Sequence, residues 1–174
     1  MLSLFVAAAC HDFEHPGVNS VFLINMNDPM AIRHNDISVL ESHHIAASFS
    51  LMNSSEKTNW MHKYSPEEYK RMRKLMIDAV FATDITKHFG DVGQFKGIIS
   101  QPEFNPKTGT DKHKLILMMF HMADISNPSK PFELCRLWTD LLFVEFFAQG
   151  DLEKQHEFPI SMFFDRNTTN VAKS

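Results

Sequence analysis

The chain has 174 residues, and 17 Lys and Arg against 21 Asp and Glu give a formal net charge of -4 at pH 7. A hydrophobic content of 44% with a charged content of 22% is typical of a globular protein and argues against a linker or low-complexity protein. The mild acidity argues against a nucleic-acid binder, because neutralising phosphates requires clustered cations. Two cysteines cannot build a disulfide framework, so we expect a reducing compartment, the cytoplasm. No apolar run reaches the roughly 18 residues of a membrane span.

Three helices are predicted in the first half of the chain. The apolar stretch 1–10 predicts a buried helix that begins before the chain does, because no capping residue precedes it. A secretory signal is rejected, since the stretch lacks a basic start and charged residues follow at 11–15. Residues 38–50 are a second candidate helix. At Ser65 a capping-box pattern with Pro at the first helical position opens a third helix, whose apolar residues recur at spacings of three and four until about Thr86.

Two further helices are predicted in the second half. One covers 112–123, and the other runs from 131 to 149 and stops at Gly150, a residue typical of helix ends. Loops are expected at 15–17, 53–59 and 101–111, and no stretch shows the alternation of a strand. The fold class is therefore all-α, as one domain or part of one.

Acidic and imidazole side chains at three places could carry chemistry. His11 and Asp12 follow the first apolar helix, and imidazole and carboxylate both bind divalent ions, although most His-Asp dipeptides bind no metal. Asp124 ends an apolar helix that should be buried, where it either pairs with a cation or caps the next segment. Asp84 ends the long helix and either faces the same crevice or is a solvated helix end. These alternatives stay open at the level of the residues alone.

Five motifs in collinear order resemble the class I 3′,5′-cyclic nucleotide phosphodiesterases, which belong to the wider HD phosphohydrolase superfamily. The first motif, Ala9 to Gly17, resembles the family signature His-Asp-x-Asp-His-Pro-Gly. The resemblance covers nearly the whole chain and continues through residues 35–44, 82–84, 123–128 and 138–151.

The resemblance implies a compact all-helical HD-type catalytic domain with two divalent metal ions, zinc in the tight position and magnesium or manganese in the second. By position, His11, Asp12 and Asp124 match metal ligands, with Asp12 touching both ions. A hydroxide activated by the two ions would attack the cyclic phosphate in line. His15 matches the histidine that contacts the phosphate, and Glu41 matches the glutamate that orients the general-acid histidine. Thr83 and Asp84 match residues that lie behind the second ion.

The resemblance also implies a nucleotide pocket. Asp12 and Asp124 would face the substrate from the metal side, and Phe146 lies where the family stacks an aromatic ring on the purine. Taken alone, the apolar members of this set would be interpreted as core packing. The members that match or neighbour the purine clamp are Ile125, Asn127, Leu142, Phe146 and Phe163.

The sequence departs from the family pattern at several points. The upstream His-x-x-x-His motif, which supplies the first metal ligand and the general acid, is absent, and the purine-gripping glutamine would follow Ser174. Glu14 stands where Asp is usual, and Ser20 where a second Asn is common. We therefore expect residues 1–174 to be a single partial catalytic domain, truncated at both ends and nearly inactive by itself.

Two functions of different classes follow. The first is hydrolysis of cAMP or cGMP to the 5′-monophosphate in cyclic-nucleotide signal transduction, with Asn127-Pro128 resembling the cAMP-selective members. The second is a truncated, non-catalytic product that only binds nucleotide or a protein partner. A third possibility is an HD phosphohydrolase that acts on nucleotide monophosphates. It ranks below the other two, because the motifs at 123–128 and 138–151 belong to the cyclic-nucleotide branch. The oligomeric state stays open.

Overall fold

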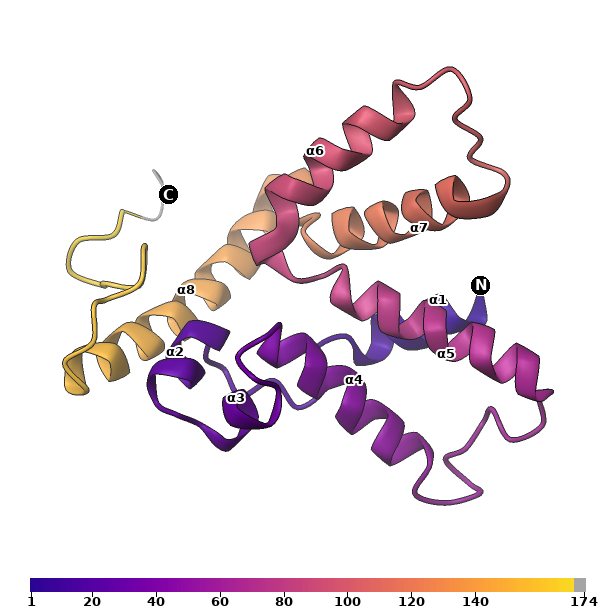
Figure 1. Ribbon diagram of the computed structural model, residues 1–174. Helices are drawn as coiled ribbons and strands as arrows, with labels where there is room; N and C mark the ends of the chain where they lie inside the picture. Colours follow the sequence, from indigo (N-terminus) through magenta and orange to yellow (C-terminus); the bar gives the residue numbers. More distant parts are fainter. Residues whose placement is uncertain (171–174) are drawn as a thin grey trace. The chain divides into compact units, whose positions relative to one another are not determined.

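The computed structural model describes residues 1–170, which contain helices and no strand, as the all-α prediction requires (Figure 1). The predicted position of the glutamine, directly after Ser174, lies outside the described residues. The α-helices are α1 (Leu2–Cys10), α2 (Ser20–Asn25), α3 (Pro29–Arg33), α4 (Val39–Met52), α5 (Pro66–Phe81), α6 (His88–Ile99), α7 (Gly109–Asp124) and α8 (Phe132–Gln155). Two 3-10 turns complete the order, η1 (Ile85–Lys87) and η2 (Asn127–Ser129). None of these helices is long and apolar enough to cross a membrane.

The chain divides into two compact units. Unit 1 comprises residues 1–14 and 40–125, and unit 2 comprises residues 15–39 and 126–174. In unit 1, α1 packs along α5, and α6 and α7 form an antiparallel pair joined by the loop after Ile99 (Figure 1). In unit 2, α2 packs on α3, and η2 packs on the start of α8.

The core of unit 1 lies between α1, α4 and α5. Its buried side chains are Ala7, Ile45, Phe49, Met52, Met61, Met76, Ala79 and Val80. The apolar stretch 1–10 was predicted to be a buried helix, and this is wrong for most of its length: only Ser3 and Ala7 are buried, and Phe5 is 67% exposed. One face of α1 packs on the core, and the opposite face is apolar without being covered within the unit.

The capping box at the start of α5 is present as predicted. Ser65 Oγ accepts from the Glu68 amide at 3.3 Å, and Glu68 Oε2 accepts from the Ser65 amide at 3.0 Å. The predicted end near Thr86 is wrong, because α5 stops at Phe81. Thr83 Oγ1 donates to the Val80 carbonyl, and Asp84 accepts from the Thr86 amide to start η1, so local hydrogen bonds end the helix early.

The prediction that Gly150 stops the last helix is also wrong, since α8 continues to Gln155. Gly150 is buried against the returning chain, and a Cβ on it would lie 2.0 Å from the Phe164 carbonyl oxygen. The glycine therefore permits a close backbone approach within unit 2 and does not serve as a helix end. The remaining helices were not predicted: α2 and α3 are short, and α6 contains three glycines, which weaken the helix signal.

Candidate functional site

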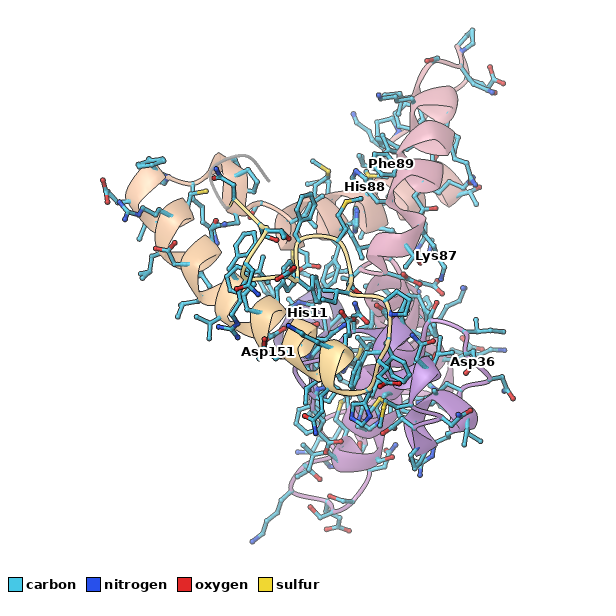
Figure 2. All side chains as sticks on the ribbon, turned by 90° about the vertical axis from the view of Figure 1, so that its left-hand side faces the viewer. His11, Asp36, Lys87, His88, Phe89 and Asp151 are labelled. Carbon is cyan, nitrogen blue, oxygen red and sulfur yellow. The ribbon has the colours of Figure 1, made fainter. Side chains whose placement is uncertain are left out.

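The end of α1 and the end of α7 bring three of the predicted site residues together in unit 1. His11 Nε2 lies 3.1 Å from Asp12 Oδ2 and 3.1 Å from Asp124 Oδ1, and His11 Nδ1 donates to the Ala8 carbonyl at 2.9 Å. His11 and Asp124 are 113 positions apart in the sequence, so the fold creates this contact. One imidazole nitrogen thus faces two carboxylates (His11 is labelled in Figure 2).

The two carboxylates of this cluster favour the binding of a cation. The hydrogen bonds that the imidazole donates to the Asp12 and Asp124 carboxylates raise the pKa of His11 from 6.5 to about 11, against the opposing effect of burial. A proton on the imidazole therefore offsets one of the two carboxylate charges. The chemistry of the donors, one imidazole nitrogen and two carboxylates, fits a divalent ion of the zinc, magnesium or manganese type. As the side chains stand, no three His, Cys, Asp or Glu within residues 1–170 form a group that could hold a metal ion.

The prediction that Asp124 ends a buried helix is partly wrong. The helix before it was expected to be buried, but His121 is the one buried residue of α7, and Met119 is 63% exposed. The Asp124 side chain is itself 30% exposed. Asp124 does not cap the next segment either, because the N-cap residue of η2 is Ser126. Of the two alternatives that the sequence left open, the structure agrees with pairing, because Asp124 contacts His11.

Glu41, Thr83 and Asp84 lie on α4 and on the turn that follows α5. Asp84 is 5% exposed, so it is not a solvated helix end; it lies 3.1 Å from Lys87 Nζ and accepts from Thr86. Burial raises the pKa of the Glu41 carboxyl, its own backbone amide opposes this, and the charges of Asp84 and Asp12 raise it further. Several carboxyl groups therefore act on one another electrostatically in this unit.

The predicted substrate residues fall on both units. His15, in unit 2, is exposed, and its Nδ1 accepts from the Gly17 amide at 3.0 Å. Phe146 stacks on Phe164 at 4.3 Å between ring centroids, and Leu142 and Phe163 are each 45% exposed. Ile125, at the end of unit 1, is half-buried.

Asn127 has a fixed amide orientation. Its Nδ2 donates to the Cys135 carbonyl at 3.2 Å and to Thr139 Oγ1 at 3.3 Å. Thr139 Oγ1 donates in turn to Cys135, so it can only accept from Asn127. The Asn127 Oδ1 is buried and has no hydrogen-bond partner within the described part of the chain. Asn127 Oδ1 is therefore an acceptor that the described residues leave unused.

Two features of unit 1 were missed from the sequence. His43 and His44, for which the motifs gave no role, contact the turn that carries Asp12. A cavity of about 430 Å³ lies among α5, α6 and α7, near the point where Lys87, His88 and Phe89 follow one another into α6 (Figure 2). Its wall includes Phe95, Leu117 and His121 but none of the predicted site residues. A buried histidine cannot be distinguished from an exposed one by local sequence.

Comparison with known proteins decides the family. A family model of the 3′5′-cyclic nucleotide phosphodiesterases matches residues 1–174. The chain belongs to this family. The all-helical fold, the five motifs and the meeting of His11 with Asp12 and Asp124 all agree with that membership, which also implies a general dependence on metal ions.

Three curated relatives are similar to nearly the whole chain. A probable 3′,5′-cyclic phosphodiesterase of Caenorhabditis elegans, pde-3, is 39% identical over 99% of the chain and 25% of its own length. The high affinity cAMP-specific and IBMX-insensitive 3′,5′-cyclic phosphodiesterase 8 of Drosophila melanogaster is 40% identical over 97% of the chain and 19% of its own length. A second probable 3′,5′-cyclic phosphodiesterase of Caenorhabditis elegans, pde-1, is 39% identical over 100% of the chain and 25% of its own length. The chain thus spans a quarter or less of these relatives.

Proposed function

We propose that the protein to which this chain belongs hydrolyses 3′,5′-cyclic nucleotides, with cAMP as its preferred substrate. The observation that carries the proposal is the meeting of His11 with Asp12 and Asp124, at the positions where the family binds its ions. Family membership over residues 1–174 supports the reaction class. The two free cysteines, Cys10 and Cys135, agree with the cytoplasmic location that we also propose.

In the proposed reaction, water attacks the phosphorus, the bond between phosphorus and the 3′ oxygen breaks, and the leaving oxygen takes a proton. His11, Asp12 and Asp124 would hold two divalent ions, which we expect to be zinc and either magnesium or manganese. When bound, the ions activate the attacking water and neutralise the charge that develops on the phosphate. His15 would bind the phosphate, Glu41 would orient the acid that protonates the 3′ oxygen, and Thr83 and Asp84 would support the second ion.

The orientation of the Asn127 amide supports the proposed preference for cAMP. Its Nδ2 is engaged by Cys135 and Thr139, which leaves Oδ1 as an acceptor. The exocyclic amino group of adenine is a hydrogen-bond donor, whereas guanine presents an acceptor at that position. Phe146, Leu142, Ile125 and Phe163 would enclose the base. The relative from Drosophila melanogaster is named cAMP-specific, which agrees with this interpretation.

The test measures hydrolysis of cAMP, cGMP and 5′-AMP by the protein in its natural full length, with added zinc and manganese. We expect turnover of cAMP above cGMP and none of 5′-AMP. Asp124→Asn should lower kcat/KM by at least about 100-fold, because an ion ligand is lost. The matched control is Asp78→Asn: His113 Nε2 contacts the Asp78 carboxylate at 2.9 Å in the same unit, so a similar His-Asp pair is removed away from the site.

The control should change kcat/KM by less than about twofold, since Asp78 lies outside the set of residues assigned to the ions and the substrate. Binding of nucleotide without any turnover would contradict the proposal and support the non-catalytic alternative. Turnover of 5′-AMP alone would instead favour a phosphohydrolase acting on monophosphates.

A further inference from the structure

Side chains of α4 attach the turn that follows α1 at three points. Ser48 Oγ donates to the Cys10 carbonyl at 3.5 Å, and His44 Nδ1 donates to the Phe13 carbonyl at 2.7 Å. His43 Nε2 lies 3.0 Å from Glu14 Oε2. His44 and Ser48 are one helical turn apart, so they lie on the same face of α4. The turn that carries Asp12 is thus bound to the helix at both of its ends.

His44 is the buried member of this set. The residue is 2% exposed, and its Nε2 lies 3.9 Å from Asp12 Oδ1. The Asp12 side chain, in contrast, is 64% exposed, so packing does little to fix its position. The position of the Asp12 carboxylate therefore depends on its contact with His11 and on how firmly the backbone of residues 10–14 is held.

The backbone of this turn needs such support. Glu14 has a φ of 59°, in the left-handed region that residues with a side chain adopt at an energetic cost. The contact of His43 with the Glu14 carboxylate stabilises Glu14 in this conformation. The hydrogen bond from His44 to the Phe13 carbonyl fixes the peptide between Phe13 and Glu14, one residue after Asp12.

We infer that His44 is a positioning residue for Asp12, acting through the Phe13 carbonyl, and that His43 supports the same turn at Glu14. The inference rests on the proposed function, in which Asp12 binds the divalent ions. The competing explanation is that His44 only fills the core between α1 and α4. In that case an apolar side chain of similar size would serve equally well.

The test uses the protein in its natural full length and three variants. His44→Leu removes the donor and keeps the volume. His44→Asn restores a donor, because the Asn amide nitrogen occupies about the place of the His Nδ1. His62→Leu is the control: His62 is exposed, and its Nδ1 donates to the Asn59 carbonyl at 2.5 Å, so the same bond type is lost elsewhere.

Two quantities are measured, amide hydrogen exchange in residues 10–14 and the Kd for Mn²⁺. In His44→Leu we expect exchange at residues 10–14 to become at least about tenfold faster, because the turn opens more often. The Kd for Mn²⁺ should rise by about 10–100-fold, as is usual when the support of an ion ligand is removed. His44→Asn should return both quantities to within about threefold of the wild type, and His62→Leu should leave both unchanged.

Unchanged exchange and Kd in His44→Leu would overturn the inference, and so would a weakened Kd that His44→Asn does not restore. If His44→Leu does not fold, His44→Gln replaces it, because Gln places its donor near the Nε2 position. The inference then requires tight Mn²⁺ binding by the Asn variant and weak binding by the Gln variant. A wild type that binds no Mn²⁺, or whose Kd is insensitive to Asp12→Asn, contradicts the proposed function. The exchange rates then still decide whether His44 orders the turn.

Discussion

Glu41 is half-buried on α4, and this burial raises the pKa of its carboxyl. Its own backbone amide lowers the pKa, and the charges of Asp84 and Asp12 raise it. A carboxyl whose pKa is higher in the folded chain than in the unfolded chain binds its proton more tightly when folded. The ionised form therefore costs stability at pH values above the folded pKa, and this cost disappears as the pH falls below 4.5, the value for an unperturbed Glu.

Replacing Glu41 by Gln should consequently have opposite effects on stability and on activity. At pH 7 we expect a higher Tm than in the wild type, because a half-buried charge near Asp84 and Asp12 is removed. The gain should vanish as the pH approaches 4. We expect kcat to fall by at least about tenfold, since the proposed orienting carboxylate is lost.

The measurement is thermal unfolding of the full-length protein between pH 4 and 8, with initial rates at pH 7. Glu103→Gln is the control, because Glu103 is exposed in the loop before α7. We expect this variant to change neither the Tm nor kcat. A lower Tm for Glu41→Gln at pH 7 would contradict the assignment of a stability cost to the ionised carboxyl.

The site residues illustrate what the sequence can predict. The contact of His11 with Asp12 and Asp124 agrees with the expectation that they share one place, although their role as ion ligands stays a prediction. The motifs supplied that expectation, and local pattern alone left it open. The function of His44 could not be predicted, because its burial depends on how α4 packs on α1, which no spacing in the sequence records.

Among the elements, Gly150 shows why a correct rule gave a wrong boundary. Glycine is common after helix ends because it tolerates positive φ. It is equally suited to a helix interior where another backbone approaches closely, and a single sequence cannot distinguish the two uses. In α6, three glycines lower the helix propensity, so the sequence did not predict this helix. Its packing against α7 supports the helix in the structure. The capping box of α5 was predictable, since both of its bonds are local.

The two uses of glycine predict opposite effects of Ala. Gly150→Ala places a Cβ 2.0 Å from the Phe164 carbonyl oxygen and 2.7 Å from the Phe164 carbonyl carbon, and backbone atoms cannot move aside cheaply. We expect the free energy of unfolding to fall by about 1–3 kcal/mol. In Gly97→Ala, nothing lies within 4 Å of the new Cβ, and the residue is inside α6. That variant should gain about 0.5–1 kcal/mol.

Urea unfolding of the full-length protein measures both values, and the first variant has a second consequence. A shift of Phe164 also displaces the ring that stacks on Phe146, so KM for cAMP should rise in Gly150→Ala and not in Gly97→Ala. Equal stabilities of the two variants would mean that the close approach of residues 150 and 164 does not exist in solution.

On the scale of the whole molecule, the described chain leaves many large apolar side chains exposed. Many of them lie on α1 and along α8, with Phe5, Trp138 and Val144 at 67%, 56% and 68% exposure. The chain also passes between its two units three times, after residues 14, 39 and 125. Periodicity predicts single helices, but membership in a unit depends on contacts between segments distant in sequence. The sequence could therefore predict α1, α4, α5, α7 and α8, but neither the remaining helices nor this division.

An ion bound at His11, Asp12 and Asp124 would join segments that are 113 positions apart within unit 1. A ligand that binds only the folded chain stabilises it by RT ln(1 + [L]/Kd), which is about 2.7 kcal/mol at 100 times Kd. We therefore expect saturating zinc to raise the Tm of the full-length protein by roughly 5–10 °C, and a chelator to reverse this. Asp124→Asn should abolish the shift, and Asp78→Asn should keep it. A shift of equal size in both variants would place the stabilising ion elsewhere in the molecule.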